Sequence, residues 1–335
     1  MGAPREPGSA PPAGDPGYEE RLAARQERLH VPIGAACNNH CLFCMEENRV
    51  DRAAVNGAMT PERVRWVLER ERGAEEVCFT SGEPTTRKEL PQFVAWAREL
   101  GYPRVSLMTN GRRLSYPPYA AALLRSGLNR VYVSIHGHEA RLHEGLTRAP
   151  GSFDQTVAGL RAVAALKRPG DQLHTSTVVN TRNLPFLAEI FGFLRGLGVD
   201  QVVFNAMRAE GGAHTHFEAL YPRYRDVAAS FAALCRGAAE PRPPAFLVDV
   251  PPCLTGAIPD FNRGFVERHR RYQPPGHEGA PAPEEAAGEG LRLMPQGEGR
   301  EKRSACAACR YEPHCDGVWL NYLARFGWEE FEPVR

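Results

Sequence analysis

The chain has 335 residues, of which 42% are hydrophobic, and its formal net charge is +1 at pH 7. This length fits one large α/β barrel, and the nearly balanced, interleaved charges exclude the basic surface of a nucleic-acid-binding protein. Because the sequence contains neither a run of about 18 apolar residues nor a basic segment followed by an apolar stretch at its start, we expect a cytoplasmic protein without a membrane partner.

The first 28 residues are rich in Pro, Gly and Ala, and this composition predicts disorder. Short apolar runs, which predict strands, then alternate with amphipathic patterns. The six predicted strands are Leu29–Ile33, Val77–Thr80, Val105–Thr109, Val131–Ile135, Leu173–Val179 and Val202–Phe204. The six predicted helices are one capped by Thr60, then Glu89–Leu100, Tyr119–Arg125, Phe153–Lys167, Leu184–Leu197 and Tyr224–Arg236. This alternation over residues 29–237 predicts a parallel sheet with right-handed crossovers, either an open doubly wound sheet or a full or partial barrel.

Residues 238–335 are predicted to form a small Cys-rich extension. Within it, residues 274–303 contain the stretch PPGHEGAPAPEEAAGEG, whose composition predicts a disordered insert.

Cys37, Cys41 and Cys44 follow the first predicted strand directly. In a parallel α/β fold the carboxyl ends of the strands form the active face, so these thiols lie where chemistry is expected. Three thiolates suit an iron–sulfur cluster and leave one of four irons open for a small molecule. The alternative is a structural zinc site with His40 or a distant residue as fourth ligand.

The Cys-x3-Cys-x2-Cys spacing, with Phe43 before the last cysteine, resembles the signature of the radical S-adenosylmethionine (SAM) superfamily. The resemblance implies a partial (β/α)6 TIM-type barrel and a [4Fe–4S] cluster on Cys37, Cys41 and Cys44. It also implies that SAM chelates the open iron through its amino and carboxylate groups, with Phe43 near the adenine.

Later strand ends match the family in order. Ser81-Gly82-Glu83-Pro84 is similar to its Gly-Gly-Glu-Pro loop, with Ser81 in place of the first Gly, and an exposed carboxylate there could accept the SAM amine. His136 stands where many relatives have Asp. Alone, each polar residue at these ends could be a cap or turn residue. Together the resemblance implies SAM contacts from Phe43, Gly82, Glu83, Pro84, Asn110, Ser134, Arg148 and Asn180, with Asn183 beside the last.

Three histidines, His136, His138 and His143, are spaced across one predicted loop. We expect them at the surface or in the substrate pocket rather than on a metal. Cys78 and Cys235 are predicted to be small core residues.

A second cluster, Cys306-x2-Cys309-x5-Cys315, has metal-ligand spacing, and Cys253 could supply a fourth thiolate. The spacing resembles the core of the SPASM domain, but Trp319 stands where its next cysteine would be. The chain can therefore complete one auxiliary [4Fe–4S] cluster, as in the shorter twitch type, while zinc stays an alternative. The tail Val318–Phe326 is expected to cover this cluster.

The resemblance implies that the protein cleaves SAM reductively to a 5′-deoxyadenosyl radical, which removes hydrogen from a substrate. We expect oxidation or cross-linking of a peptide or of a small natural-product precursor, with an electron donor such as flavodoxin or ferredoxin. The ending Glu-Pro-Val-Arg disfavours a molybdopterin-precursor cyclase, which typically ends in Gly-Gly, and the short start predicts a separate recognition protein for any peptide substrate. The alternative is a non-catalytic iron–sulfur or zinc protein used for binding or electron transfer.

Overall fold

A computed structural model describes residues 26–34, 36–46, 57, 59–208, 210–237, 243–255, 267–272, 291–293, 299–312 and 315–335. Its centre is a curved sheet in which each of the first six strands pairs in parallel with the next along the chain, which gives seven parallel strands. These strands are β1 (Gln26–Pro32), β2 (Glu76–Thr80), β3 (Arg104–Thr109), β4 (Arg130–Ser134), β5 (Gln172–Val179), β6 (Gln201–Ala206) and β7 (Ala245–Val248). Strand β8 (Glu267–Tyr272) pairs in parallel with β1, and β9 (Leu291–Leu293) pairs with β8 in antiparallel orientation.

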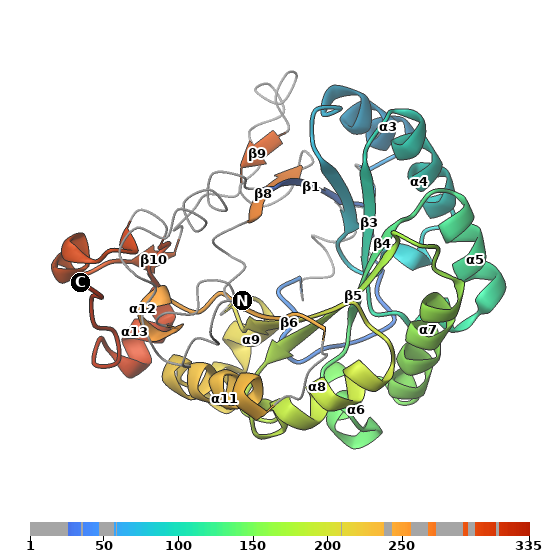
Figure 1. Ribbon diagram of the computed structural model, residues 1–335. Helices are drawn as coiled ribbons and strands as arrows, with labels where there is room; N and C mark the ends of the chain where they lie inside the picture. Colours follow the sequence, from blue (N-terminus) through green and yellow to red (C-terminus); the bar gives the residue numbers. More distant parts are fainter. Residues whose placement is uncertain are drawn as a thin grey trace, which may run out of the picture.

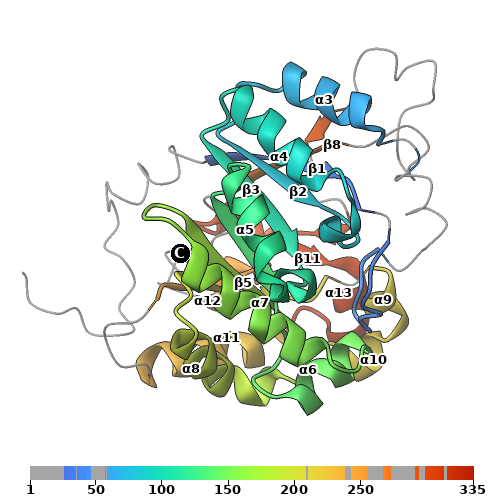
Figure 2. The same ribbon diagram turned by 90° about the vertical axis from the view of Figure 1, so that its right-hand side faces the viewer.

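The crossover helices lie on the outer, convex face of this sheet (Figure 1). They are α3 (Pro61–Arg70), α4 (Leu90–Glu99), α5 (Pro117–Arg125), α6 (Ala140–Thr147), α7 (Ser152–Leu166), α8 (Leu187–Gly196) and α11 (Tyr224–Gly237). Short helices are α9 (Gly212–Thr215), α10 (Phe217–Leu220) and α12 (Pro252–Thr255), and 3-10 turns occur at η1 (Pro84–Thr86), η2 (Arg112–Ser115), η3 (Leu184–Phe186) and η6 (Ser304–Ala308). Figure 2 views the molecule from this outer side, with α4, α5 and α7 in front of the strands.

Strand alternation explains why the sheet has two different faces. In β2, Val77 and Phe79 are fully buried, and the Phe79 ring contacts Phe93 of α4 with centroids 6.3 Å apart. Cys78 and Thr80 point the opposite way, to the concave face, because successive strand residues alternate. The apolar face of the sheet therefore packs against the helices, and the concave face does not.

Helix α3 begins after Thr60, whose side chain accepts a hydrogen bond from the Arg63 N–H at 3.2 Å.

This architecture confirms the predicted partial barrel, because the sheet order runs from β7 to β9 and does not close on itself. All six predicted strands are present within one to three residues at each end. The prediction of six strands was too low, since β7 and β8 extend the sheet on its two sides. β7 has only four residues after a Pro-rich segment, so its pattern is too short to stand out.

The structure contradicts parts of the two predictions of disorder. Residues 26–28 belong to β1, so the N-terminal segment is shorter than predicted, and residues 1–25 lie outside the described residues. The predicted insert at 274–303 contains β9 and β10 (Arg300–Glu301), so disorder is wrong for these strands, while 273–290 and 294–298 also lie outside the described residues. Within the described ranges, no helix combines the length and the apolar character that crossing a bilayer requires.

The C-terminal extension packs against the barrel through aromatic rings. Strand β10 pairs with β11 (Val318–Trp319), and α13 (Leu320–Phe326) follows. The Tyr322 ring stacks on Tyr224 of α11 with centroids 4.3 Å apart, and its hydroxyl accepts the Tyr224 N–H at 2.9 Å. α13 therefore attaches the extension to α11, near the β6–β7 side of the barrel (Figure 1).

Candidate active site

The three N-terminal cysteines lie in the loop after β1, at the carboxyl end of the barrel, and each is half-buried. Backbone hydrogen bonds attach this loop to neighbouring elements. The His40 N–H donates to the Thr147 carbonyl at 2.8 Å, and the Gly212 N–H donates to the Cys44 carbonyl at 2.8 Å. The loop is thus held between the end of α6 and the start of α9. Its conformation does not depend on its own residues alone.

Polar side chains that follow β3 form hydrogen bonds with the same cysteine loop. The Asn110 side-chain amide donates to Asn38 Oδ1 at 2.6 Å, and the Arg112 guanidinium donates to Asn39 Oδ1 at 2.9 Å and to the Asn38 carbonyl. Asn110 is therefore at the predicted place beside the cysteines. The structure adds Arg112, which the sequence pattern did not single out.

The loop after β2 packs backbone to backbone against the start of the cysteine loop. The Glu83 N–H donates to the Ala36 carbonyl at 2.8 Å, and a Cβ on Gly82 would lie 2.7 Å from the Gly34 carbonyl oxygen. A Cβ on Gly34 would lie only 2.2 Å from the Ser81 carbonyl oxygen. Close approach therefore requires glycine at both positions. Pro84 is buried at the start of η1.

The Glu83 carboxylate is not exposed, contrary to our expectation, because only 1% of the residue is accessible. Its Oε1 accepts from the Thr85 N–H at 3.1 Å and from the Thr85 and Thr109 hydroxyls, each at 2.6 Å, and its Oε2 accepts the Asn110 N–H at 2.6 Å. Burial raises the pKa of this carboxyl, although these hydrogen bonds act in the opposite direction. Glu83 therefore joins the ends of β2 and β3 inside the protein.

The remaining predicted SAM contacts have different surroundings. Ser134 is half-buried at the end of β4, and Arg148 is exposed in the left-handed C-cap of α6. Asn180 is fully buried, where its Nδ2 donates to the Val178 carbonyl at 3.1 Å. Asn183 is equally buried and donates to the same carbonyl at 2.9 Å. Asn183 also donates to the His136 carbonyl at 3.2 Å and so links its loop to the loop after β4. A contact of Ser134, Arg148 or Asn180 with SAM stays a prediction.

Phe43 packs on a histidine rather than facing solvent. Its ring meets His136 edge-on with centroids 4.7 Å apart, and the His136 ring stacks on His143 at 5.8 Å. Nδ1 of His136 accepts the Val178 N–H at 3.3 Å. Burial lowers the pKa of His136 well below its ordinary value and that of His143 to about 4, so both imidazoles are neutral. Of the predicted alternatives, a surface position is therefore wrong for these two histidines, and a place in the substrate pocket stays a prediction, while His138 is half-buried.

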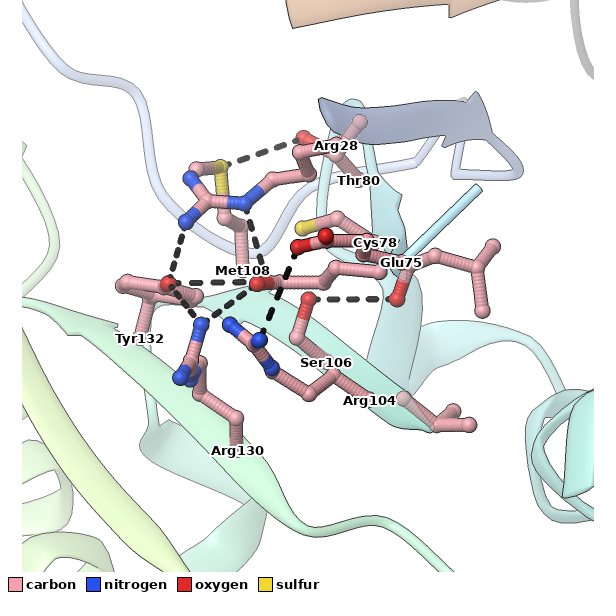
Figure 3. Close-up of polar contacts among 12 residues, drawn as sticks. Arg28, Glu75, Cys78, Thr80, Arg104, Ser106, Met108, Arg130 and Tyr132 are labelled. Atoms are coloured by element: carbon pink, nitrogen blue, oxygen red, sulfur yellow. Dashed lines mark hydrogen bonds and ion pairs between the residues drawn. The ribbon is translucent and has the colours of Figure 1, made fainter. Parts of the chain in front are cut away.

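Charged side chains near the amino ends of β1, β2 and β4 meet on the concave face and form what we call the floor of the barrel (Figure 3). Glu76 forms ion pairs with Arg28 at 2.9 Å and with Arg130 at 2.5 Å. The Arg28 guanidinium also donates to the Tyr132 hydroxyl at 2.5 Å. All four side chains are at most 6% exposed. A barrel interior is ordinarily filled by branched apolar residues, so this charged floor is unusual.

Above that floor, the inward-facing positions nearer the cysteines are half-buried and of mixed character. The polar or polarizable ones are His30, Thr80, Met108, Ser134, Ser176 and Asn205, and the apolar ones are Val178, Val203, Phe246 and Val248. The Asn205 amide donates to Ser176 Oγ at 2.7 Å, and Thr80 donates to Met108 Sδ at 3.7 Å. Cys78, at the level of the floor, is fully buried as predicted, and burial raises the pKa of its thiol to about 12.

The four C-terminal cysteines line one cavity, although Cys253 is 53 positions before Cys306. The cavity has an empty volume of about 350 Å³, and Pro252, Tyr311, Phe331 and Pro333 contribute apolar walls. Burial raises the pKa of the Cys253 thiol to about 12, and the neighbouring thiols Cys315, Cys309 and Cys306 add to this rise. The predicted four-thiol set is therefore brought together. The expected cover by Val318–Phe326 is wrong, because none of these residues lines the cavity: Val318 and Trp319 pair with β10, Tyr322 stacks on Tyr224 of α11, and Phe326 contacts Phe217 of α10.

An ion-pair network connects this second site to the barrel. Asp249, which follows β7, accepts from Arg208 at 3.2 Å and from Arg300 of the extension at 3.3 Å. Burial would raise the pKa of the Asp249 carboxyl, but the Arg208 and Arg300 guanidinium groups hold it below its ordinary value. The Arg300 guanidinium also lies over the Trp319 ring, 4.3 Å from its centroid. This network places Cys253, four residues after Asp249, beside the thiols of the extension.

No group of three or more His, Cys, Asp or Glu side chains within the described ranges is arranged to hold a metal ion. None of the nine cysteines, all of which lie in those ranges, forms a disulfide. The assignment of cluster ligands therefore rests on spacing, on the placement of the loop and on the shared cavity.

Replacing Cys306, Cys309 and Cys315 by alanine together is expected to remove about half of the iron of the anaerobically purified protein, since each [4Fe–4S] cluster carries four irons. Iron and zinc contents measured by mass spectrometry provide the readout. Cys235→Ala is the matched control, because this half-buried cysteine lies on α11 away from the cavity. Unchanged iron would refute an auxiliary cluster, and loss of one zinc instead would identify a structural zinc site.

A parallel partial barrel with a three-cysteine loop at its carboxyl end defines a class of cluster-dependent enzymes. Residues 31–194 match the model of the Radical SAM superfamily, and the chain belongs to this superfamily, which uses a [4Fe–4S] cluster and SAM.

The chain is similar to a probable GTP 3′,8-cyclase of Sulfurisphaera tokodaii, with 30% identity over 202 residues that cover 59% of this chain and 62% of that protein. It is 28% identical over 168 residues to an AdoMet-dependent heme synthase of Oleidesulfovibrio alaskensis, covering 50% and 42% respectively. These matches span only about half of the length of the relatives. The crystal structure of Streptococcus suis SuiB has the same fold, with a TM-score of 0.60, 14% identity and coverage of 96% of this chain and 83% of that chain.

Sequence reasoning missed several residues that the structure places at the site. A signal was available for the floor, since Arg28, Glu76 and Arg130 each stand one residue before a predicted strand. Glu46 and Arg112 carried no such signal, because their partners lie 35 or more positions away.

Proposed function

We propose that this radical SAM enzyme cleaves SAM reductively and removes a hydrogen atom from a substrate held on the concave face of the barrel. The observation that carries the proposal is the position of the three-cysteine loop at the carboxyl end of the strands, where the inner side chains are half-buried. When bound to Cys37, Cys41 and Cys44, the cluster supplies the electron that splits SAM into methionine and a 5′-deoxyadenosyl radical.

The protein's own residues orient the reactants and exclude water. Asn110 and Arg112 hold the cysteine loop, while the Arg28–Glu76–Arg130 ion pairs close the lower end of the barrel. Because buried ion pairs fill the amino end of the barrel, a substrate can bind only at its carboxyl end, near the cysteines. Such enclosure suppresses side reactions of a radical with solvent.

The lining suits a substrate with both polar and apolar parts, because the accessible inner positions His30, Ser134, Ser176 and Asn205 lie beside the apolar Val178, Val203, Phe246 and Val248. We propose oxidation or cross-linking of a small natural-product precursor or of a peptide segment that enters the barrel. The names of the relatives, GTP 3′,8-cyclase and heme synthase, add small-molecule chemistry in support of the first class.

The thiolates of Cys253, Cys306, Cys309 and Cys315 would hold an auxiliary [4Fe–4S] cluster, which can accept an electron from the substrate. We propose a flavodoxin or ferredoxin as electron donor to the first site. A reducing compartment such as the cytoplasm is consistent with nine cysteines that form no disulfide.

The test is to purify the protein without oxygen, reduce it with dithionite in the presence of SAM and measure 5′-deoxyadenosine by chromatography. The wild-type chain is expected to form it, and Cys41→Ala, which removes one ligand of the first cluster, is expected to reduce its formation at least 100-fold. Cys235→Ala serves as control and should retain it. If the wild-type chain forms none with any reductant, the non-catalytic iron–sulfur or zinc role replaces this proposal.

A further inference from the structure

Arg208 stands just beyond the carboxyl end of β6, at the rim of the barrel. It follows the inward-facing Asn205 by three residues, and Asp249 directly follows the inward-facing Val248 of β7. Asn205 and Val248 are partners in the register of these two strands, so the Arg208–Asp249 pair adjoins the inner face of the barrel. Loops at the carboxyl ends of parallel strands commonly carry binding residues, and a charged side chain here is placed to meet a substrate.

The loop that carries Arg208 also contacts the first group of cysteines, because the Gly212 N–H donates to the Cys44 carbonyl at 2.8 Å. Four residues span at most about 14 Å, which limits the Cα distance from Arg208 to Gly212. The same limit applies from Asp249 to Cys253, which lines the second cavity. The Arg208–Asp249 pair is therefore near both groups of cysteines.

One edge of the Arg208 guanidinium is occupied and another is not. Its Nε donates to Asp249 Oδ2 at 3.2 Å, which is the only hydrogen bond of this side chain within the described ranges, and the side chain is 27% exposed. Two further carboxylates act on it electrostatically, Glu210 and Asp316, but both are exposed and neither forms a hydrogen bond with it. The edge formed by Nη1 and Nη2 is thus left for a ligand.

Asp249 orients this guanidinium and is itself held from the other side. Its Oδ1 accepts from Arg300 of the extension at 3.3 Å. The Arg300 side chain is only 10% exposed, because its guanidinium lies over the Trp319 ring. Of the two guanidinium groups that share Asp249, Arg208 is therefore the one that a ligand can reach.

A carboxylate fits this arrangement better than a chain of phosphates. The Nη1 and Nη2 edge offers two parallel donors whose spacing matches the two oxygens of one carboxylate. A phosphate chain carries more charge and would require further accessible cations, whereas the neighbouring Arg300 is enclosed.

We propose that Arg208 binds a carboxylate group of the substrate and so holds the substrate at the rim of the barrel, near both groups of cysteines. The carboxylate belongs either to a small acid or to a peptide, and the chemistry of recognition is the same for both. This inference deepens the proposed function and rests on it, since it takes the concave face as the substrate site.

The test is the binding of N-acetylglycine, a probe with one carboxylate, measured by saturation-transfer NMR on the anaerobically purified protein. N-acetylglycinamide has nearly the same shape without the charge. We expect the wild-type protein to bind the acid about 10-fold more tightly than the amide, as for a charge-assisted hydrogen bond. Arg208→Gln should bind both probes with the same Kd. Arg208→Lys, which keeps the charge but not the two parallel donors, should show an intermediate ratio.

Arg168→Gln is the matched control. Arg168 also donates through Nε to an aspartate, Asp171 at 3.0 Å, but this exposed pair precedes β5 at the amino end of the sheet. The control should keep the wild-type preference for the acid. A peptide acid, N-acetyltriglycine, distinguishes the two sources: tighter binding than N-acetylglycine assigns the carboxylate to a peptide, weaker binding assigns it to a small acid, and either result supports the inference.

Equal binding of acid and amide by the wild-type protein, or an unchanged preference for the acid in Arg208→Gln, would overturn the inference. Tighter binding of inorganic phosphate than of N-acetylglycine would show that the carboxylate class is wrong. If Arg208→Gln does not retain wild-type iron, Arg208→Lys decides, and its acid-to-amide ratio must fall by about threefold or more. Formation of 5′-deoxyadenosine by the same wild-type preparation separates the two hypotheses. Its absence refutes the proposed function, whereas its presence without a preference for the acid refutes this inference alone.

Discussion

The Glu76→Gln variant is expected to lose about 3–5 kcal/mol of stability, because the substitution leaves two buried guanidinium groups without their shared carboxylate. Arg28, Glu76 and Arg130 are 5%, 2% and 6% exposed, so water cannot replace the lost charge. An unfolding entropy of about 2.1 cal/mol/K per residue amounts to roughly 0.7 kcal/mol/K for 335 residues, so the thermal midpoint should fall by about 4–7 °C. Differential scanning calorimetry of the purified protein measures this shift.

Glu69→Gln is the matched control for this measurement. Glu69 pairs with Arg65 at 3.0 Å on the surface of α3, where the two side chains are 43% and 47% exposed. An exposed pair of this kind contributes less than about 0.5 kcal/mol, so the control should unfold within 1 °C of wild type. Similar midpoints for the two variants would show that the floor of the barrel does not depend on its charges.

The Gly34→Ala variant is expected to lose most of its SAM cleavage although Ala is the smallest possible addition. The new Cβ would lie 2.2 Å from the Ser81 carbonyl oxygen and 3.1 Å from backbone atoms of Glu83. Backbone cannot move aside as a flexible side chain can, so the loop after β2 must shift away from the cysteine loop. A displacement of about 1 Å in an active site can reduce a rate about 100-fold, and we expect a loss of this size in 5′-deoxyadenosine formation.

Gly73→Ala provides the comparison, because a Cβ at that turn meets no atom within 4 Å. It should retain wild-type cleavage and wild-type iron. If Gly34→Ala cleaves SAM at a rate within threefold of wild type, the close approach of position 34 to the Ser81 carbonyl oxygen does not determine the geometry of the site.

The fold class could be read from local patterns because each strand buries one face under a helix. Val77 and Phe79 contact the helical layer, and their alternation with polar neighbours is visible in the sequence. The two cysteine groups were equally visible, since ligands of one cluster are close together in the chain. Strand β7 was missed because four residues are too few to establish a period.

The hydrogen-bond partners of the Glu83 and Glu46 carboxylates could not be predicted from local patterns. Glu83 belongs to a recognisable loop, yet its carboxylate is enclosed by donors from β3, 26 and 27 positions away. Glu46 belongs to no recognisable pattern, yet it meets Ser81 and Gly82, 35 and 36 positions away. Local residue type therefore indicated which loops form the candidate site. It did not indicate which side chains of these loops are buried or what they contact.

The sequence by itself determined the parallel α/β sheet and the three-cysteine loop, because periodicity and ligand spacing are properties of neighbouring residues, and the resemblance of its motifs implied the family and the partial barrel. The tertiary structure alone decided that Arg28, Glu76 and Arg130 meet inside the barrel, and it brought Cys253, which the sequence offered only as a possible ligand, to one cavity with Cys306, Cys309 and Cys315. These relations depend on the order and register of strands that are far apart in the chain. No local pattern carries that information, because burial and electrostatic pairing arise only when the strands are assembled.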